Sequence, residues 1–196
     1  LFHALPATIG GQQGLPLRTE ETGEQHFEVL LPADAVPAAW NQLMTSGAPF
    51  AIKPVGAPAR ELLRIEAGLP KAGPDLNEEI VPPEANLEGK AFSLSKGCYP
   101  GQEVVARMDT YGNVRRHLVG LIIQDKTVPP AGSKLFSGDR EVGWVSSAVF
   151  SPQRNAALAF GFPLRDFSAP DTTLTVEVAG TRHQATVHAL PFQKHS

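Results

Sequence analysis

The chain has 196 residues, of which 42% are hydrophobic and 19% charged, so it is long enough to bury one large core or two smaller ones. Its formal net charge of -3 argues against broad, sequence-independent nucleic-acid binding, which needs a large positive field, and we expect no direct DNA binding. A single cysteine cannot form an internal disulfide, which favours a reducing compartment.

The sequence shows no apolar run long enough for a membrane helix and no signal peptide. We therefore expect a cytoplasmic protein that does not bind membranes. Because the chain starts with Leu1 and not with Met, we also expect it to be a processed or incomplete piece of a longer protein.

The first half of the chain begins with a strand and a helix. Residues 26–32 (HFEVLLP) predict a strand that ends at a proline. Asp34 is the expected N-cap of a helix over residues 35–47, which ends at a glycine. The apolar spacing i, i+3, i+4 predicts one shared helix face, formed by Trp40, Leu43 and Met44.

A second strand and helix follow, so the first half is typical of an α+β fold. We expect a short strand over residues 48–55 and a helix over residues 59–68. Residues 71–99 have little periodicity. Long irregular segments in compact domains are more often functional than accidental.

After residue 114 the pattern changes to short strands separated by turns, which is typical of a small closed barrel or sandwich. In residues 173–178 (TLTVEV), alternation predicts that Leu174, Val176 and Val178 share a buried face. We therefore expect an α+β portion over residues 1–114 and a six-stranded antiparallel β-barrel over residues 115–196. The six expected strands cover residues 117–123, 133–136, 141–150, 156–162, 173–178 and 182–190.

The cysteine lies in the polar, glycine-rich stretch KGCYPGQEVVAR, residues 96–107. One interpretation is a functional thiol, because Lys96 and the arginines that follow favour a thiolate. The other is a small buried core residue, because free cysteines are among the most buried side chains. The surroundings favour the first interpretation. We expect Cys98 to be partly accessible, in a loop that Gln102 and Glu103 fix through hydrogen bonds to the backbone.

Glu84 follows two prolines in PPEANL, residues 82–87. A carboxylate there is able to accept two hydrogen bonds from the amino-pyrimidine edge of a pterin, or it is a solvated loop acid. Arg115 and Arg116 are suited to gripping a polyanionic tail such as a glutamate chain, or they are surface charge. Spacing alone leaves both questions open. With one cysteine and scattered histidines, we expect no metal site.

These motifs together resemble a known family. KGCYPGQEVVAR resembles the signature of the folate-binding YgfZ-type proteins, which are relatives of the glycine-cleavage T-protein (aminomethyltransferase). TGEQHFEVLLP, ARELLRIEAGLPKAGPDL and PPEANL are similar to shared segments of these proteins, and VGWVSSAVFSP and LPF are similar to their C-terminal barrel. The resemblance covers the chain from about Thr22 to Phe192. T-proteins lack the Lys-Gly-Cys core, so the chain resembles the YgfZ branch.

The resemblance implies that the α+β portion contributes to a cleft that binds tetrahydrofolate or a one-carbon-substituted folate. It implies an accessory protein that supports assembly or repair of iron–sulfur enzymes, including a tRNA-modifying one. The expected partners are then folate and those iron–sulfur enzymes or their assembly machinery. The resemblance makes Lys96 and Cys98 the expected catalytic pair. It assigns folate binding to Glu84, Asn86, Gln102, Glu103, Arg107, Arg115 and Arg116.

Three alternatives stay open. Family members begin with a long segment that has no counterpart here, and in T-proteins that segment holds the aspartate credited with catalysis; such an aspartate would favour a folate-dependent aminomethyltransferase or other one-carbon transferase. An RNA-binding barrel is a second alternative, opposed by the net charge and by the lack of an aromatic row for base stacking. A thiol redox sensor is the third, and it usually requires a resolving cysteine that this chain lacks.

Overall fold

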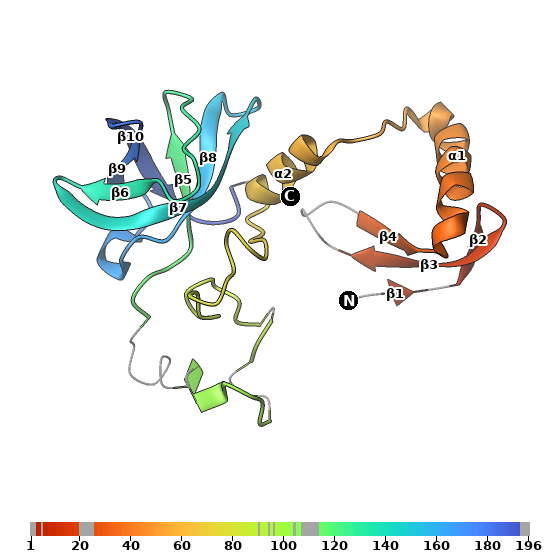
Figure 1. Ribbon diagram of the computed structural model, residues 1–196, viewed down its shortest axis with the longest axis horizontal. Helices are drawn as coiled ribbons and strands as arrows, with labels where there is room; N and C mark the ends of the chain where they lie inside the picture. Colours follow the sequence, from red (N-terminus) through yellow and green to blue (C-terminus); the bar gives the residue numbers. More distant parts are fainter. Residues whose placement is uncertain are drawn as a thin grey trace. The chain divides into compact units, whose positions relative to one another are not determined.

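The computed structural model describes residues 3–4, 6–19, 26–89, 91–93, 95, 97–103, 105–106 and 114–192 (Figure 1). The chain divides into two compact units, an N-terminal unit of residues 1–60 with 195–196 and a C-terminal unit of residues 61–194. Among the described residues, none of the helices has the length and apolar character that a membrane crossing requires.

The N-terminal unit contains a four-stranded antiparallel sheet built around one long strand, β3. The strands are β1 (His3–Ala4), β2 (Ala7–Ile9), β3 (Gln12–Thr19) and β4 (His26–Leu30). The β2–β3 turn contains Gly10, whose φ is 63°. A Cβ at Gly10 would lie 2.6 Å from the backbone nitrogen of Ala39, so this turn requires glycine for both its conformation and its contact with the following helix.

The predicted strand 26–32 and helix 35–47 are confirmed as β4 and α1 (Val36–Gly47). The predicted cap is wrong. Asp34 lies within a 3-10 turn, η2 (Ala33–Ala35), in which the backbone nitrogen of Ala35 donates to Pro32 O at 3.0 Å. The N-cap of α1 is Ala35, which has no side-chain oxygen to offer to the helix amides.

The predicted strand over residues 48–55 is also wrong. Residues Ala48–Phe50 form a second 3-10 turn, η3, because the proline at its centre has a φ suited to helical backbone. Ala51 then adopts a left-handed φ of 56°, and Ile52 N donates to Gly47 O at 3.2 Å, which ends α1. The next helix, α2 (Ala57–Glu66), confirms the helix predicted over residues 59–68.

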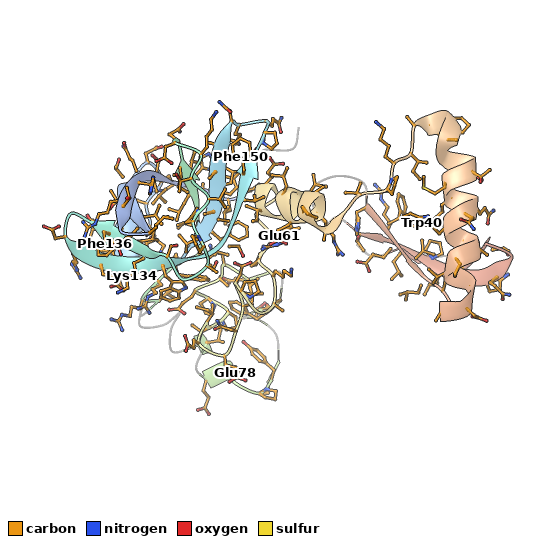
Figure 2. The ribbon with its side chains drawn as sticks, turned by 45° about the horizontal axis from the view of Figure 1, so that its top comes forward. Trp40, Glu61, Glu78, Lys134, Phe136 and Phe150 are labelled. Carbon is orange, nitrogen blue, oxygen red and sulfur yellow. The ribbon has the colours of Figure 1, made fainter. Side chains whose placement is uncertain are left out.

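The N-terminal unit leaves large apolar side chains exposed. Trp40, which is labelled on α1 in Figure 2, is 53% exposed, and Phe50 is 85% exposed. Among the described residues of this unit, the buried apolar side chains are Ala35 and Ala39. The apolar helix face that the sequence predicts is therefore present, but the described residues do not cover it.

The C-terminal unit contains the predicted closed, six-stranded antiparallel barrel, with the strand order β10-β5-β8-β7-β6-β9 (Figure 1). Leu174 and Val176 face its interior, each at most 1% exposed, and Val178 packs against the same core, which confirms the predicted alternation. The strands are β5 (Val119–Ile123), β6 (Lys134–Ser137), β7 (Arg140–Ser151), β8 (Ala156–Gly161), β9 (Thr173–Val178) and β10 (Thr181–His188).

A second apolar cluster covers the outer side of β8. Every residue of β8 is buried, because Ala157 and Ala159 face the barrel interior while Leu158 and Phe160 belong to the outer cluster with Ile65 of α2. A strand that is covered on both faces has no wet side and therefore loses the alternating pattern. The barrel thus depends on the C-terminal end of α2 as part of its packing.

A buried carboxylate, Asp75, joins the irregular segment to both α2 and the barrel. One of its oxygens accepts hydrogen bonds from the guanidinium of Arg64 and from the backbone nitrogen of Lys71, both at 2.9 Å. The other accepts the hydroxyls of Ser146 at 2.6 Å and Ser147 at 2.7 Å. Four donors compensate the charge, which a fully buried carboxylate requires.

The two serines reach Asp75 through a β-bulge. Ser146 and Ser147 are adjacent in β7, and adjacent side chains of a regular strand point to opposite faces. The pairing of β7 with β8 shifts its register between Val145 and Ser147. A bulge of this kind re-aims side chains locally, and here it turns two neighbouring hydroxyls toward one carboxylate.

We expect Asp75→Ala to destabilise the C-terminal unit by roughly 3–5 kcal/mol, because it removes one of the two carboxylates paired with Arg64, the other being Glu61, and leaves the hydroxyls of Ser146 and Ser147 without their shared acceptor. Urea unfolding followed by Trp144 fluorescence in a Trp40→Phe background reports on the barrel alone. The matched control is Asp139→Ala, whose exposed ion pair should contribute at most about 1 kcal/mol. Equal unfolding midpoints for the two variants would contradict the assignment.

Candidate functional site

The candidate site is built around the turn at residues 82–86, which is fixed to the beginning of the barrel. The backbone nitrogen of Leu118 donates to Glu84 O at 2.7 Å, and the side-chain amide of Asn86 donates to Leu118 O at 2.8 Å. Asn86 has a φ of 54°, a conformation that asparagine tolerates better than most residues. Two hydrogen bonds thus hold this turn against the residue that precedes β5.

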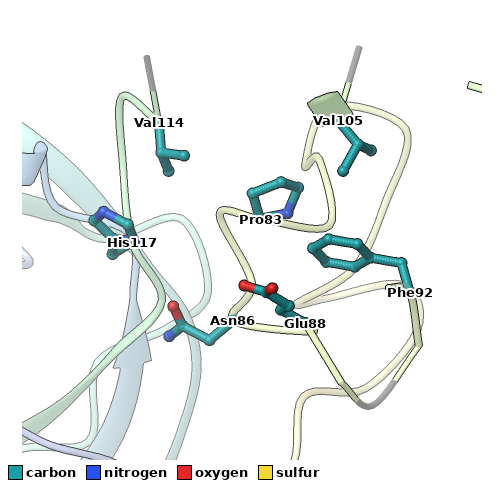
Figure 3. Close-up of a pocket in the computed structure, with 7 residues that line it drawn as sticks. All are labelled: Pro83, Asn86, Glu88, Phe92, Val105, Val114 and His117. Carbon is teal, nitrogen blue, oxygen red and sulfur yellow. The ribbon is translucent and has the colours of Figure 1, made fainter. Parts of the chain in front are cut away.

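A cavity of about 310 Å³ lies beside this turn, and we call it the His117 cavity (Figure 3). Its walls combine apolar and aromatic side chains with a few polar groups that differ in chemistry: an amide, a carboxylate and an imidazole. That composition and volume are typical of pockets for small ligands. The lining residues are Pro83, Asn86, Glu88, Phe92, Val105, Val114 and His117.

Glu84 belongs to the same turn but is not one of the residues that line this cavity. Its side chain is 8% exposed, and its neighbours Pro83 and Asn86 line the cavity. One carboxylate oxygen accepts from the backbone nitrogen of Val81 at 3.4 Å, which is the upper limit of a hydrogen bond. A second hydrogen bond to this carboxylate is not found among the described residues, so the charge is only weakly compensated.

The imidazole of His117 lines the cavity and is close enough to Glu84 to sense its charge. Burial, and secondarily the positive charge of Arg165, lower the pKa of His117, while the charge of Glu84 opposes this shift. The neutral imidazole is therefore the dominant form at neutral pH. As pH falls below the ordinary histidine value of about 6.5, the unfolded chain binds a proton first, and the fold loses stability.

Residues of the cysteine motif line a second cavity, of about 460 Å³, which we call the Cys98 cavity. The Cys98 side chain is exposed, as the sequence predicts. The side-chain oxygen of Gln102 accepts from the backbone nitrogen of Tyr99 at 3.3 Å, which confirms the expected role of Gln102 in fixing this loop. The described lining residues are Cys98, Tyr99, Gly101, Gln102 and Glu103.

The structure distributes the expected site residues over several places. Lys96 and Arg107 lie outside the described residues. Arg115 is exposed, whereas the guanidinium of Arg116 lies over the ring of Trp144, 4.8 Å from its centroid. The His117 cavity and the Cys98 cavity share none of their described lining residues, and Cys98 lies in the second. The cysteine motif nevertheless reaches the first, because Val105 lines the His117 cavity together with Pro83 and Asn86 of the folate-site turn.

Four cavity residues lie outside the motifs that the sequence analysis singled out for the site: Glu88, Phe92, Val114 and His117. His117 immediately follows the Arg115-Arg116 pair, and this position is the one signal that pointed to it. Its approach to the turn at residues 82–86 comes from hydrogen bonds between segments that are distant in sequence, which spacing does not reveal. Among the described residues, three or more His, Cys, Asp or Glu side chains do not come together as metal ligands.

Both parts of the chain match domains of one protein family. Residues 1–94 match the N-terminal domain of the glycine-cleavage T-protein, and residues 116–194 match its C-terminal barrel domain. Together these segments cover most of the chain, which is therefore a relative of the glycine-cleavage T-protein. The T-protein side of the resemblance is confirmed, and the YgfZ-type assignment stays a prediction.

Individual relatives agree with this result. The chain is 34% identical to the aminomethyltransferase of Chlorobium limicola, with 93% of this chain and 50% of the relative covered. It is 37% identical to the aminomethyltransferase of Aquifex aeolicus, over 89% of this chain and 47% of the relative. The crystal structure of the glycine cleavage system aminomethyltransferase T from Bartonella henselae superposes with a TM-score of 0.82 at 28% identity, covering 92% of this chain and 52% of that one. The chain thus spans about half the length of these relatives.

We expect native Cys98 to react with iodoacetamide at nearly its rate in denaturant, because the side chain is exposed. Mass spectrometry gives the rate without ambiguity, since the chain has one cysteine. Cys98→Ser serves as the unlabelled control, and its free energy of unfolding should lie within about 0.5 kcal/mol of the wild-type value. A thiol that reacts only after unfolding would show that Cys98 is a core residue.

Proposed function

We propose that this protein binds a reduced folate in the His117 cavity and forms the folate-binding part of a one-carbon transferase of the glycine-cleavage T-protein type. The observation that carries the proposal is the Glu84 carboxylate, which is buried beside the cavity with a single long hydrogen bond among the described residues. Its position in PPEANL, the segment similar to the family's folate site, supports the same ligand.

The chemistry of a pterin suits this carboxylate. A buried carboxylate with poor compensation costs several kcal/mol, so a ligand that supplies hydrogen-bond donors stabilises it. The amino-pyrimidine edge of a pterin presents such donors in a row. Because Glu84 does not itself line the cavity, contact between its carboxylate and a ligand would require the turn at residues 82–86 to shift. The exposed Arg115 is available to the anionic tail of a folate.

The shape and composition of the cavity also fit a flat heterocycle. Phe92 offers an aromatic surface, while Asn86, Glu88 and His117 offer donors and acceptors around it (Figure 3). All of these residues belong to the C-terminal unit. We keep residues 1–114 and 115–196 as the proposed functional division, in which the first portion supplies the turn and the second supplies His117.

The transferase assignment rests on the relatives, which are named aminomethyltransferases. Since the chain spans about half of their length, the activity of a complete transferase is a proposal for this chain. Tetrahydrofolate, or a one-carbon-substituted folate, is the proposed ligand and folate the proposed partner. A cytoplasmic location is proposed on the single free cysteine.

We expect Glu84→Gln to weaken tetrahydrofolate binding by roughly 2–3 kcal/mol, the cost of losing a charged hydrogen-bond acceptor. Calorimetric titration of wild type and variant measures this difference, and a thermal melt verifies that the turn still folds. The matched control is Glu79→Gln, an exposed carboxylate in the same segment, which should bind as wild type does. Equal affinities for Glu84→Gln and Glu79→Gln would remove Glu84 from the folate site.

A second candidate function is supported by the exposed thiol. We infer from Cys98, in a cavity of its own and in a stretch that resembles the YgfZ-type signature, that the protein supports assembly or repair of iron–sulfur enzymes, including a tRNA-modifying one. Here Cys98 and Lys96 act as the reactive pair, Gln102 and Glu103 shape the loop, and Arg107 contributes positive charge. The partners are then iron–sulfur enzymes or their assembly machinery.

Cellular complementation separates the two functions. If the thiol carries the second function, Cys98→Ser should abolish rescue of an iron–sulfur-dependent tRNA modification in cells that lack their own copy, and Lys96→Ala should reduce it. Folate affinity and melting temperature should stay unchanged in Cys98→Ser, because the Cys98 cavity shares no described residue with the His117 cavity. Full rescue by Cys98→Ser would leave the transferase as the supported function.

A further inference from the structure

The imidazole of His117 is a polar group whose role the fold itself does not explain. Its backbone nitrogen donates to Pro163 O at 3.4 Å, which fixes the chain at this point. Its side chain is half-buried and lines the His117 cavity (Figure 3), and among the described residues the ring has no hydrogen-bond partner. Polar groups in such positions usually have a partner, so a ligand or water must supply it.

We propose that His117 is a specificity-determining residue of the folate cavity, which contacts the uncharged pterin ring through a neutral imidazole. This inference rests on the proposed function, because it concerns the same cavity and ligand. A neutral imidazole donates from one ring nitrogen and accepts at the other. The lactam edge of a pterin carries an N–H donor next to a carbonyl acceptor, so the two groups match as neutral partners.

The charges around His117 favour this neutral form. Arg165, in the 3-10 turn η4 (Arg165–Phe167), acts on the imidazole with burial to lower its pKa, and Glu84 acts in the opposite direction. Glu88 lines the same cavity, and the guanidinium of Arg116 lies against Trp144. The burial and the arginine outweigh the acid, so the ring stays unprotonated near neutral pH.

A charged histidine would have the opposite preference. An imidazolium donates from both nitrogens and accepts from neither, so it would favour the carboxylates of the folate tail over the pterin ring. The two forms therefore make different predictions about which part of the ligand depends on His117 and about the direction of the pH effect.

The experiment compares two probes, 5-formyltetrahydrofolate and p-aminobenzoylglutamate, which is the folate tail without the pterin. Each is titrated by calorimetry into the full chain at about pH 7.5 and about pH 5, the lower value being set well below the ordinary histidine pKa because burial lowers the pKa of His117. The variants are His117→Leu, which removes both ring nitrogens, and His117→Asn, which keeps a donor and an acceptor and does not titrate. His183→Asn, at the Asp125 pair on another part of the barrel, is the matched control. Thermal melts verify folding at each pH.

We expect the wild type and His183→Asn to bind 5-formyltetrahydrofolate more weakly at the lower pH. His117→Leu should lose about tenfold in affinity at the higher pH, the equivalent of one hydrogen bond, and should show no pH dependence. His117→Asn should keep most of the affinity and also lose the pH dependence. Binding of p-aminobenzoylglutamate should be the same in all variants.

The results distinguish a failure of the proposed role of His117 from a failure of folate binding. Wild-type affinity for 5-formyltetrahydrofolate in His117→Leu, or an unchanged pH dependence in His117→Asn, would overturn the role of His117 and leave folate binding intact. An equal loss of p-aminobenzoylglutamate binding in His117→Leu would show that the histidine contacts the tail, which also overturns the inference. No binding of either probe to the wild type at both pH values would overturn the proposed function together with it.

Discussion

The buried ion pair between Asp75 and Arg64 is the interaction on which the geometry of the C-terminal unit depends. It fixes the end of α2 and the start of the irregular segment to β7 at one point inside the protein. From there the chain runs to the turn at residues 82–86, which is held in turn by Leu118. The irregular segment is thereby attached at Asp75 and again at the turn of residues 82–86. The His117 cavity beside this turn therefore has defined walls. A charge that is costly to bury has been used to position a loop that hydrophobic packing alone would leave poorly specified.

The barrel was predictable because its signal is local. Strands such as β9 alternate between buried and exposed side chains, and turn residues separate them, so the period is visible in the sequence. The strand β3 escaped prediction because Pro16 and Gly14 interrupt its pattern, although its pairing on both sides tolerates them. The error at residues 48–55 has a related cause: apolar residues next to a proline were interpreted as a strand, whereas no partner strand exists for them among the described residues.

The site was only partly predictable, for a different physical reason. Glu84 and Cys98 could be singled out from the sequence because a carboxylate after two prolines and a single cysteine between glycines stand out locally, and their roles in a site stay predictions. His117 and Glu88 have no such surroundings, and they come to one cavity only through contacts between distant segments. The exposed Trp40 and Phe50 of the N-terminal unit are a comparable case, since the sequence predicts an apolar face but not what covers it. Exposed apolar side chains of this size are more typical of an interface than of a free surface.

The bulge in β7 has a consequence for how the C-terminal unit can be divided. The bulge turns the side chains of Ser146 and Ser147 to the same side, where both donate to Asp75, about seventy positions earlier in the chain. A barrel that began at β5 would keep the bulge in β7 but would lack the Asp75 carboxylate. It would also lose Ile65, which covers the outer side of β8. The barrel is therefore not an autonomous module, although its hydrogen-bonded ladder is closed. In hydrogen exchange, the barrel strands and residues 61–76 should open together as one cooperative unit. A chimera between two relatives should therefore take this segment and the barrel from the same parent.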